Sequence, residues 1–548
     1  MTTEDPPIPV RATAADDPDF PIAWEPGEAE LEWEWDDMHS PRAVPPLSED
    51  YLMVLGGGFA AMYREVGLPF EILTRVWNGF VYYARLIHAP EEERAALRES
   101  APDRWRSMIP RSAAYWAAAR RELEAMYAEI EAIRGTEPAA ELAAAWERAW
   151  QHAGRAWEIH FVAILGPYQV LEDLIERYAS IVEGANPADG LELVAGTVEE
   201  LAATERELAT LTAAAAAAPA IADRLRTVPA PTVDEIRALP GGPGFVHQLE
   251  DFLSRRGHLG TMCEDLTEPS WNADPRPLLG DIGRRLAADP EEATRRAAHR
   301  VALADQREAT VRAALAGQPD ELGRFEELLG FAKDIGWLTE GHNYWIDRMC
   351  SDRLRRLTRR VAHRLVADGV IDHPEDVVYL RRAEIAELIE RPADRRRTVA
   401  ERSAVHATNL RRRPPAKVGT ISPPDPNAKV DPFEGAHFAI EADGSLRGTG
   451  ASAGVIRGIA RVVRGQGDFD RVRPGDIVVA TASNPGWLPL FAIAGGFVTD
   501  TGGVLSHAAV VAREFGVPAV VGTREGTRRI EDGRLIEIDG TTGLVRFA

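Results

Sequence analysis

The chain has 548 residues, of which 45% are hydrophobic and 27% charged, as is usual for a globular protein of roughly two to four domains. Its formal net charge of −23 argues against binding to nucleic acid or to an anionic membrane. The sequence has only two cysteines, no signal-like start and no apolar stretch of membrane-spanning length. These features exclude a disulfide framework and predict a cytoplasmic protein.

The first part of the chain predicts a mostly helical domain. Residues 1–47 are expected to form an extended segment that packs on this domain. We expect the domain to span residues 48–390. Alanine, leucine, glutamate and arginine are abundant in it, and apolar residues recur at helical spacing, most clearly over 112–133 and 138–165. Residues 391–445 are rich in proline and charge, which indicates a linker.

Residues 446–548 show a different pattern and predict one compact α/β unit. Its short β-type runs lie at 455–463, 476–480, 519–521 and 535–538. With 12 Arg against 10 Asp and Glu, this unit is slightly basic, whereas the remainder is strongly acidic. The difference favours weak and reversible docking between the two parts.

The stretch 499–522 carries the most informative chemistry. Gly502 and Gly503 permit a tight turn and a close approach of a ligand to the backbone. Ser506 is expected to cap the helix that follows, and His507 is the only histidine in the last hundred residues. The sequence therefore predicts an accessible imidazole beside a glycine turn.

A helix over 508–515, ended by Gly516, would place His507 at a helix N-terminus. Free N–H groups and the positive end of the helix dipole favour a phosphate dianion there. Because imidazole is largely neutral near pH 7, a ring nitrogen is available as a nucleophile. Gly502, Gly503, Ser506 and Arg513 are expected to help hold the phosphate. The alternative is that His507 is a capping or core histidine.

The run GGVLSHAAVVARE followed by GVPAVVG resembles the phosphohistidine signature of the phosphoenolpyruvate-utilising enzymes. That family includes pyruvate phosphate dikinase, phosphoenolpyruvate synthase, rifampicin phosphotransferase and phenylphosphate synthase. The resemblance implies that the C-terminal unit is a swivelling domain, that His507 is phosphorylated, and that Gly502, Gly503 and Arg513 fill the family positions. Leu505 stands where many dikinases have threonine, which favours the rifampicin and phenylphosphate branch.

The helical region resembles the acceptor-binding domain of rifampicin phosphotransferase-like proteins. Three segments carry this resemblance: Trp33–Pro41, Arg256–Trp271 and Glu340–Arg348. Many family members have arginine where this chain has Leu259, so the acceptor is expected to differ from theirs. The resemblance thus implies a multidomain protein, with a large α-helical acceptor-binding domain followed by a small α/β phosphohistidine domain.

The acceptor site is expected to contain a base that deprotonates a hydroxyl group. The candidates for this base are His258, His342 and Asp347. Asn343 and Asp347 lie four residues apart and would share one helix face, and Trp345 could form an aromatic wall. His160 is a further candidate. Each of these histidines can instead be a hydrogen-bonded structural residue.

No metal site is expected in this chain. His258 and His342, with the neighbouring Glu264 and Asp265, offer metal-ligating side chains, but no HExxH or CxxC spacing is present. The chain has only three lysines and no GxxxxGK[ST] loop, so it lacks the features expected of an ATP-grasp domain. ATP and magnesium are therefore expected on a separate ATP-grasp subunit.

The leading hypothesis is a transfer subunit that receives a phosphoryl group on His507 from this partner and passes it to a phenol or alkylphenol. The closest resemblance in this division of labour is to phenylphosphate and alkylphenol phosphate synthases. Two alternatives stay open. One is an antibiotic phosphotransferase of the rifampicin type that works with an ATP domain in trans. The other is a relic of the family that binds a ligand without turnover.

Overall fold

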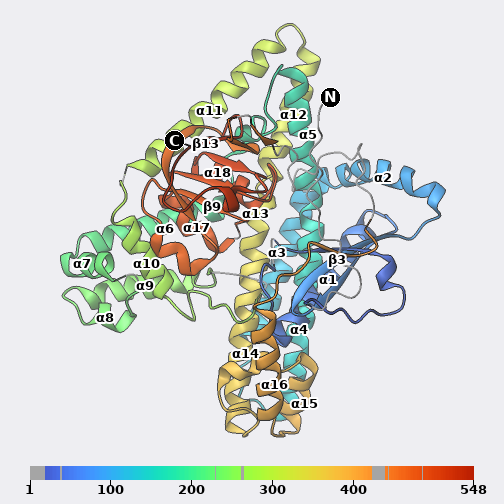
Figure 1. The fold of residues 1–548 in the computed structure, drawn as a ribbon, viewed down its shortest axis with the longest axis vertical. Helices are drawn as coiled ribbons and strands as arrows, with labels where there is room; N and C mark the ends of the chain where they lie inside the picture. Colours follow the sequence, from blue (N-terminus) through green and yellow to red (C-terminus); the bar gives the residue numbers. More distant parts are fainter. Residues whose placement is uncertain are drawn as a thin grey trace.

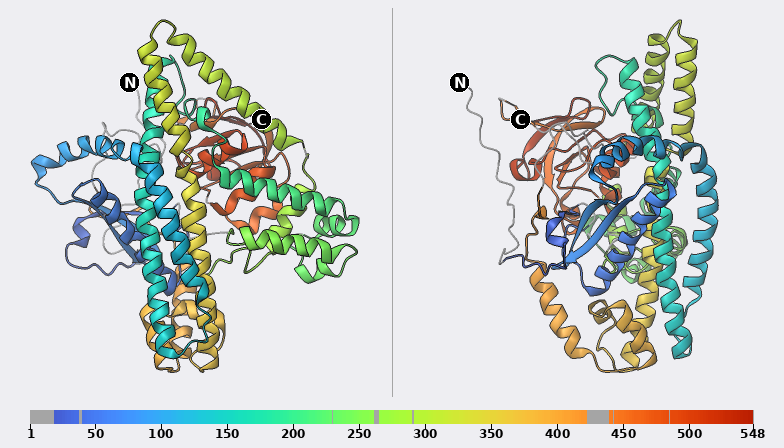
Figure 2. Two further views of the ribbon diagram at one scale, coloured as in Figure 1. Left: turned by 180° about the vertical axis from the view of Figure 1, so that it is seen from behind. Right: turned by 90° about the vertical axis from the view of Figure 1, so that its right-hand side faces the viewer.

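The computed structural model describes residues 19–37, 40–228, 230–260, 265–289, 291–421, 439–441, 443–483 and 485–547. They form a tall helical bundle, a small antiparallel sheet, a group of shorter helices and a C-terminal α/β unit (Figure 1). The C-terminal unit and the small sheet lie on different sides of the bundle in both face-on views (Figures 1 and 2). Within the described ranges, no helix combines the length and apolarity that a membrane crossing requires.

Six long helices build the bundle, because each carries an apolar stripe that its neighbours bury. They are α1 (Pro46–Glu65), α3 (Ile109–Ala132), α4 (Ala139–Ala163), α5 (Leu165–Ile181), α12 (Pro319–Ile335) and α14 (Met349–Ala367). On α4, Trp146, Trp150 and Trp157 recur at helical spacing and are buried. The helices predicted over 112–133 and 138–165 are confirmed as α3 and α4.

A π-helical turn interrupts the last long helix of the bundle. α13 (Leu338–Asn343) continues through the π-helical segment η3 (Tyr344–Arg348) directly into α14. In a π-helix the backbone bonds join residues five apart, and such turns are frequent at functional sites. The wider turn therefore places His342 and Asp347 together, whereas a regular helix would have paired Asn343 with Asp347.

A second helical group has its own core and packs beside the bundle. It consists of α6 (Glu199–Ala216), α7 (Pro219–Thr227), α8 (Val233–Arg237), α9 (Gly242–Arg256) and α10 (Arg276–Arg285). The remaining helices outside the C-terminal unit are α2 (Glu91–Arg106), α11 (Glu292–Ala314), α15 (Arg382–Glu390), α16 (Arg396–Asn409) and the short η1 (Glu28–Glu30), η2 (Leu191–Val194) and η4 (Pro374–Tyr379). Of these, α11 contacts the C-terminal unit.

The small sheet joins segments that are far apart in the sequence. Its antiparallel order is β2–β3–β1–β4, with β1 (Glu32–Trp35), β2 (Phe70–Trp77), β3 (Phe80–Ile87) and β4 (Lys417–Gly419). The hairpin of β2 and β3 lies inside the region predicted to be helical. The region 391–445 was predicted to be a linker, but it contains α16 and β4. Strand β4 is part of the sheet, because it pairs with β1 and its Val418 is buried.

The C-terminal unit contains a nine-stranded sheet of order β5–β6–β13–β12–β8–β9–β10–β11–β7. Its strands are β5 (Ala439–Ile440), β6 (Leu446–Arg447), β7 (Thr449–Ser452), β8 (Val455–Val462), β9 (Ile477–Ala480), β10 (Gly496–Thr499), β11 (Ala519–Val521), β12 (Leu535–Asp539) and β13 (Leu544–Phe547). Strands β8 to β11 are parallel. The helical segments of the unit are η5 (Gln466–Arg471), η6 (Pro485–Trp487), α17 (Leu488–Ile493), α18 (His507–Phe515) and α19 (Gly526–Arg529). The four β-type runs are confirmed as β8, β9, β11 and β12.

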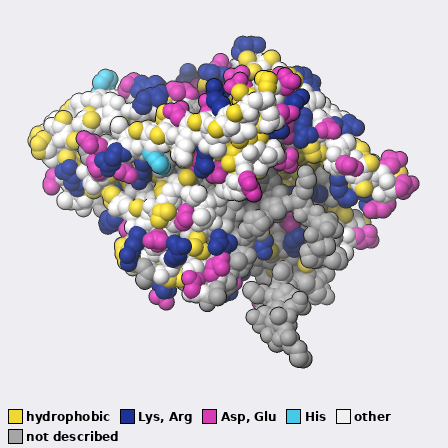
Figure 3. Space-filling model, turned by 90° about the horizontal axis from the view of Figure 1, so that it is seen from above, with side chains coloured by type: hydrophobic (Ala, Val, Ile, Leu, Met, Phe, Trp, Pro, Cys, Tyr) yellow, Lys and Arg dark blue, Asp and Glu magenta, His cyan; other side chains and the backbone are white. Residues whose placement is uncertain are grey.

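Polar contacts hold the C-terminal unit against the helical part. Glu514 accepts a hydrogen bond from the backbone N–H of Gly196 at 2.9 Å, and Arg296 donates to the carbonyl of Ala494 at 2.9 Å. Arg284 forms an ion pair with Asp470 at 3.0 Å. Seen from above, acidic and basic side chains are interspersed over the described surface (Figure 3). The two parts are thus joined by individual polar contacts and by apolar packing, as where Val504 and Leu505 join the core of the bundle.

Candidate functional site

The loop between β10 and α18 presents His507 at the start of a helix. Gly502 has a φ of +95°, a conformation that only glycine adopts readily, so the chain turns sharply between strand and helix. His507 is the first residue of α18, and Gly516 ends the helix in the left-handed conformation. The first turn of a helix has backbone N–H groups without partners in the helix. The predicted helix is confirmed, with His507 as one further residue at its start. The His507 side chain is only 10% exposed, whereas the sequence predicted an accessible imidazole.

Two residues of this loop do not have the contacts predicted for them. Ser506 occupies the capping position, but its hydroxyl donates to the carbonyl of Gly503 at 2.7 Å and caps no helical N–H. Arg513 is buried and donates to the carbonyls of Ala451 and Val504 at 2.8 and 2.7 Å. Burial lowers the pKa of Arg513 to about 10. Arg513 thus fixes the loop against β7 and does not line the cavity described below, because its guanidinium is held by these carbonyls.

A carboxylate from the helical part contacts the His507 ring. Nδ1 of His507 lies 3.0 Å from Oε2 of Glu340, which is 3% exposed and sits on α13. The other ring nitrogen, Nε2, has no hydrogen-bond partner in the part of the chain that the structure describes. Because a carboxylate accepts hydrogen bonds, this contact favours the tautomer with its proton on Nδ1. The lone pair then lies on Nε2.

His507 and Glu340 border a cavity of about 490 Å³ where the bundle, the small sheet and the C-terminal unit meet. Its aromatic walls are formed by Trp35, Phe59, Tyr83, Trp105, Trp157, Phe161 and Tyr168. Its polar wall includes His160, Thr339, Glu340, His342, Asn343 and Asp347. Apolar walls with a few converging polar groups are typical of sites for small organic ligands.

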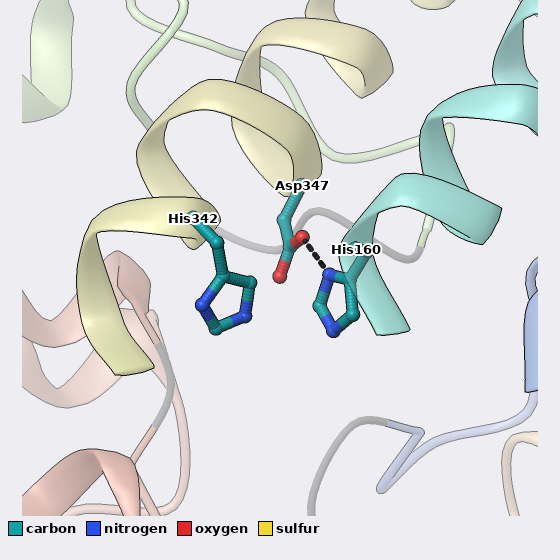
Figure 4. A group of neighbouring side chains, drawn as sticks. All are labelled: His160, His342 and Asp347. Atoms are coloured by element: carbon teal, nitrogen blue, oxygen red, sulfur yellow. Dashed lines mark hydrogen bonds and ion pairs between the residues drawn. The ribbon is translucent and has the colours of Figure 1, made fainter. Parts of the chain in front are cut away.

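Three polar residues of the cavity wall form one cluster (Figure 4). Nδ1 of His160, on α4, lies 2.8 Å from Oδ1 of Asp347. The ring centroids of His160 and His342 are 4.3 Å apart. Nδ1 of His342 donates to the carbonyl of Leu338 at 2.5 Å. Burial lowers the pKa of His342 to about 4, so this imidazole is neutral at pH 7.

The predicted acceptor residues divide into two groups. His342, Asn343 and Asp347 line the cavity. Trp345 and His258 are not among the lining residues: the indole of Trp345 donates to Glu200 at 2.7 Å, and the His258 ring packs on Tyr344. Trp345 belongs to the π-helical turn, whereas His258 follows α9 in the second helical group.

Glu340 was not among the predicted site residues, and His160 was only a further candidate. Glu340 stands in the same short segment as His342 and Asp347, so the segment itself was the available signal. Its contact with His507 spans 167 positions, and no local pattern predicts such a pair. Glu264 lies outside the described residues, and the buried Asp265 accepts a hydrogen bond from Ser48 at 2.9 Å, away from this cluster.

Two family models match the chain. Residues 472–543 match the mobile domain of PEP-utilising enzymes, and residues 162–340 match the fourth domain of rifampicin phosphotransferase. The C-terminal unit is therefore similar to the mobile domain of PEP-utilising enzymes, and part of the helical region is similar to the fourth domain of rifampicin phosphotransferase.

Individual relatives show the same similarity. The rifampicin phosphotransferase of Streptomyces sviceus is 30% identical over 58% of this chain and 36% of its own length. The uncharacterized phosphotransferase YvkC of Bacillus subtilis is 25% identical over 71% of this chain and 47% of its own. Chondramide synthase cmdD of Chondromyces crocatus is 30% identical over 96% of this chain and 14% of its own. The chain thus spans less than half the length of these relatives.

Proposed function

We propose that this chain is a phosphotransferase in which Nε2 of His507 carries a phosphoryl group and passes it to a hydroxyl group of a small organic acceptor. The observation that carries the proposal is the position of His507, which borders the cavity of the helical part while its Nδ1 is bonded to Glu340. A phosphoryl group on Nε2 would lie on the side of the ring away from that carboxylate. The similarity to the mobile domain of PEP-utilising enzymes and to a rifampicin phosphotransferase supports the same chemistry.

Glu340 has a direct role in the proposed transfer. When the acceptor oxygen bonds to phosphorus, the bond between phosphorus and Nε2 breaks and its electron pair returns to the ring. If Nδ1 keeps its proton, the leaving group is neutral imidazole and not an imidazolate anion, which is a much poorer leaving group. The carboxylate of Glu340 stabilises the proton on Nδ1 and fixes the plane of the ring.

The cavity favours an aromatic acceptor. Its volume of about 490 Å³ is in the range of sites for small organic ligands, and its walls include seven aromatic side chains. An acceptor hydroxyl would bind at the polar wall near His160, His342 and Asp347, where its proton must be removed. A phenol or alkylphenol meets both requirements. A second candidate is an antibiotic of the rifampicin type, because one family model and one relative carry the name rifampicin phosphotransferase.

The phosphoryl group must reach His507 from a donor site. The chain contains three lysines, fewer than an ATP-grasp domain would be expected to need. We therefore propose that a separate ATP-grasp subunit binds ATP and magnesium and loads His507. The C-terminal unit would move between that subunit and the acceptor cavity, and in this proposal the arrangement with His507 beside Glu340 would be the acceptor position.

The test loads the full chain with phosphoramidate, a small donor that phosphorylates imidazole nitrogens, so that no partner is needed. Phosphorylation is followed by mass spectrometry, and phenol, alkylphenols and rifampicin are then added separately. We expect a phosphohistidine at position 507 that is lost in His507→Ala but kept in His88→Ala, where the histidine is exposed. We also expect discharge to at least one acceptor. Absence of label at His507, or a phosphohistidine at position 507 that no hydroxyl acceptor discharges, would contradict the proposal.

A further inference from the structure

The cluster of His160, His342 and Asp347 has the composition of a metal site. Its three potential ligand atoms all lie within 4.8 Å of one another, and all three side chains are almost fully buried. In a tetrahedral site with bonds of about 2.1 Å, ligand atoms are about 3.4 Å apart. Small side-chain rotations would therefore bring the three atoms around one ion.

A hydrogen bond to the backbone orients one ligand nitrogen of His342 toward the other two residues. Nδ1 of His342 donates to the carbonyl of Leu338, so the lone pair of this ring is on Nε2. Figure 4 shows one ring nitrogen of His342 turned toward Asp347 and His160. Because Nδ1 faces Leu338, this second nitrogen is Nε2. A backbone carbonyl that fixes the tautomer of a ligating histidine is a common feature of metal sites.

We propose that His160, His342 and Asp347 bind one divalent transition-metal ion of the zinc type at the polar wall of the cavity. Two imidazoles and one carboxylate are ligands that zinc, manganese and iron accept, whereas magnesium prefers oxygen ligands alone. Three protein ligands leave a position open, as in catalytic zinc sites. The cavity lies next to this open position.

The role assigned to the ion rests on the proposed phosphoryl transfer. The binding of the ion to the three residues does not depend on that proposal. A metal-bound hydroxyl group loses its proton far more easily than a free one. The acceptor oxygen would bind the ion, release its proton to water in the cavity and attack the phosphorus on His507. The ion would thus supply the deprotonation that a phenol needs near neutral pH.

The test measures binding of Zn²⁺ alone to the full chain after removal of metals with a chelator. Isothermal titration is expected to show one equivalent of tight binding. His342→Gln and Asp347→Asn should each weaken binding by about 100-fold or more, since even the loss of a residue behind a ligand costs 10- to 100-fold. His258→Gln is the matched control, because this buried histidine lies outside the cavity, and it should bind as wild type.

Two further measurements keep the proposal testable. Circular dichroism must show that each variant is folded, and the visible spectrum of the Co²⁺ form should indicate four-coordinate nitrogen and oxygen ligands. His507→Ala should keep metal binding although it loses phosphorylation, which separates this proposal from the proposed function. The proposal is overturned if wild type binds no stoichiometric Zn²⁺, or if folded His342→Gln and Asp347→Asn variants bind it with unchanged affinity. Phosphoryl transfer at full rate after metal removal would overturn the role assigned to the ion.

Discussion

Glu340 and His507 lie 3.0 Å apart, and this contact joins the helical part of the chain to the C-terminal unit at the edge of the cavity. Glu340 belongs to α13 and His507 to the first turn of α18. The pair orients the ring so that Nδ1 faces the carboxylate. Any phosphoryl transfer through Nε2 therefore depends on a residue outside the domain that carries the histidine.

Replacement of this carboxylate should slow transfer without preventing loading. We expect Glu340→Gln to reduce the rate at which phosphorylated His507 is discharged to the acceptor by about 100-fold, because the neutral amide stabilises the Nδ1 proton less well. Loading by phosphoramidate should change little, and the pH dependence of discharge should shift. Glu200→Gln is the control, because Glu200 binds the indole of Trp345. Discharge of Glu340→Gln at the wild-type rate would contradict the role of Glu340.

Alanine substitutions at two neighbouring glycines of α1 should change the free energy of unfolding in opposite directions. A Cβ atom at Gly58 would lie 2.8 Å from the backbone of Trp157 on α4, whereas one at Gly57 would meet nothing within 4 Å. We expect Gly58→Ala to lower the free energy of unfolding by about 1 to 3 kcal/mol through overpacking. Gly57→Ala should raise it by up to about 1 kcal/mol. Urea denaturation followed by circular dichroism measures both, and similar effects at the two positions would refute this packing.

Arg513 should affect the loading of His507 by holding the loop before α18 in place, and not by contacting the phosphate. In Arg513→Met, the carbonyls of Ala451 and Val504 lose their donors, and we expect a loss of about 3 kcal/mol in stability. Hydrogen exchange should increase at the loop before His507, and loading should fall with it. Arg528→Met is the matched control, since Arg528 is 73% exposed. A variant that loads poorly but keeps the loop protected would indicate a direct contact between Arg513 and phosphate.

His258 should make the protein less stable in acid. Burial and the nearby Arg353 and Arg348 lower the pKa of His258 well below its usual 6.5. In the unfolded chain His258 takes up a proton below pH 6.5, whereas in the folded chain it stays neutral, so the free energy of unfolding falls as the pH drops. The slope for one such group approaches about 1.4 kcal/mol per pH unit. Urea denaturation between pH 7.5 and 5.5 should show a shallower decline for His258→Asn. An equal decline in both proteins would rule out His258 as the source.

Much of the local structure follows from the sequence. The long helices α3 and α4 are encoded by apolar residues at helical spacing, and the strands β8, β9, β11 and β12 by short β-type runs. The position of His507 after a glycine turn is also local, because Gly502 turns the chain before α18 and Gly516 ends the helix. These features depend on neighbouring residues along the chain, so a single sequence is sufficient to predict them.

The surroundings of His507 were decided by the tertiary structure. Its partner Glu340 is 167 positions away, and the pair of His160 and Asp347 spans 187 positions. The π-helical turn determined which side chains of one short segment face the cavity, and the pairing of β4 with β1 gave structure to a stretch whose composition indicated a linker. Contacts of this kind depend on how whole helices and strands pack, and local composition and periodicity contain no information about them.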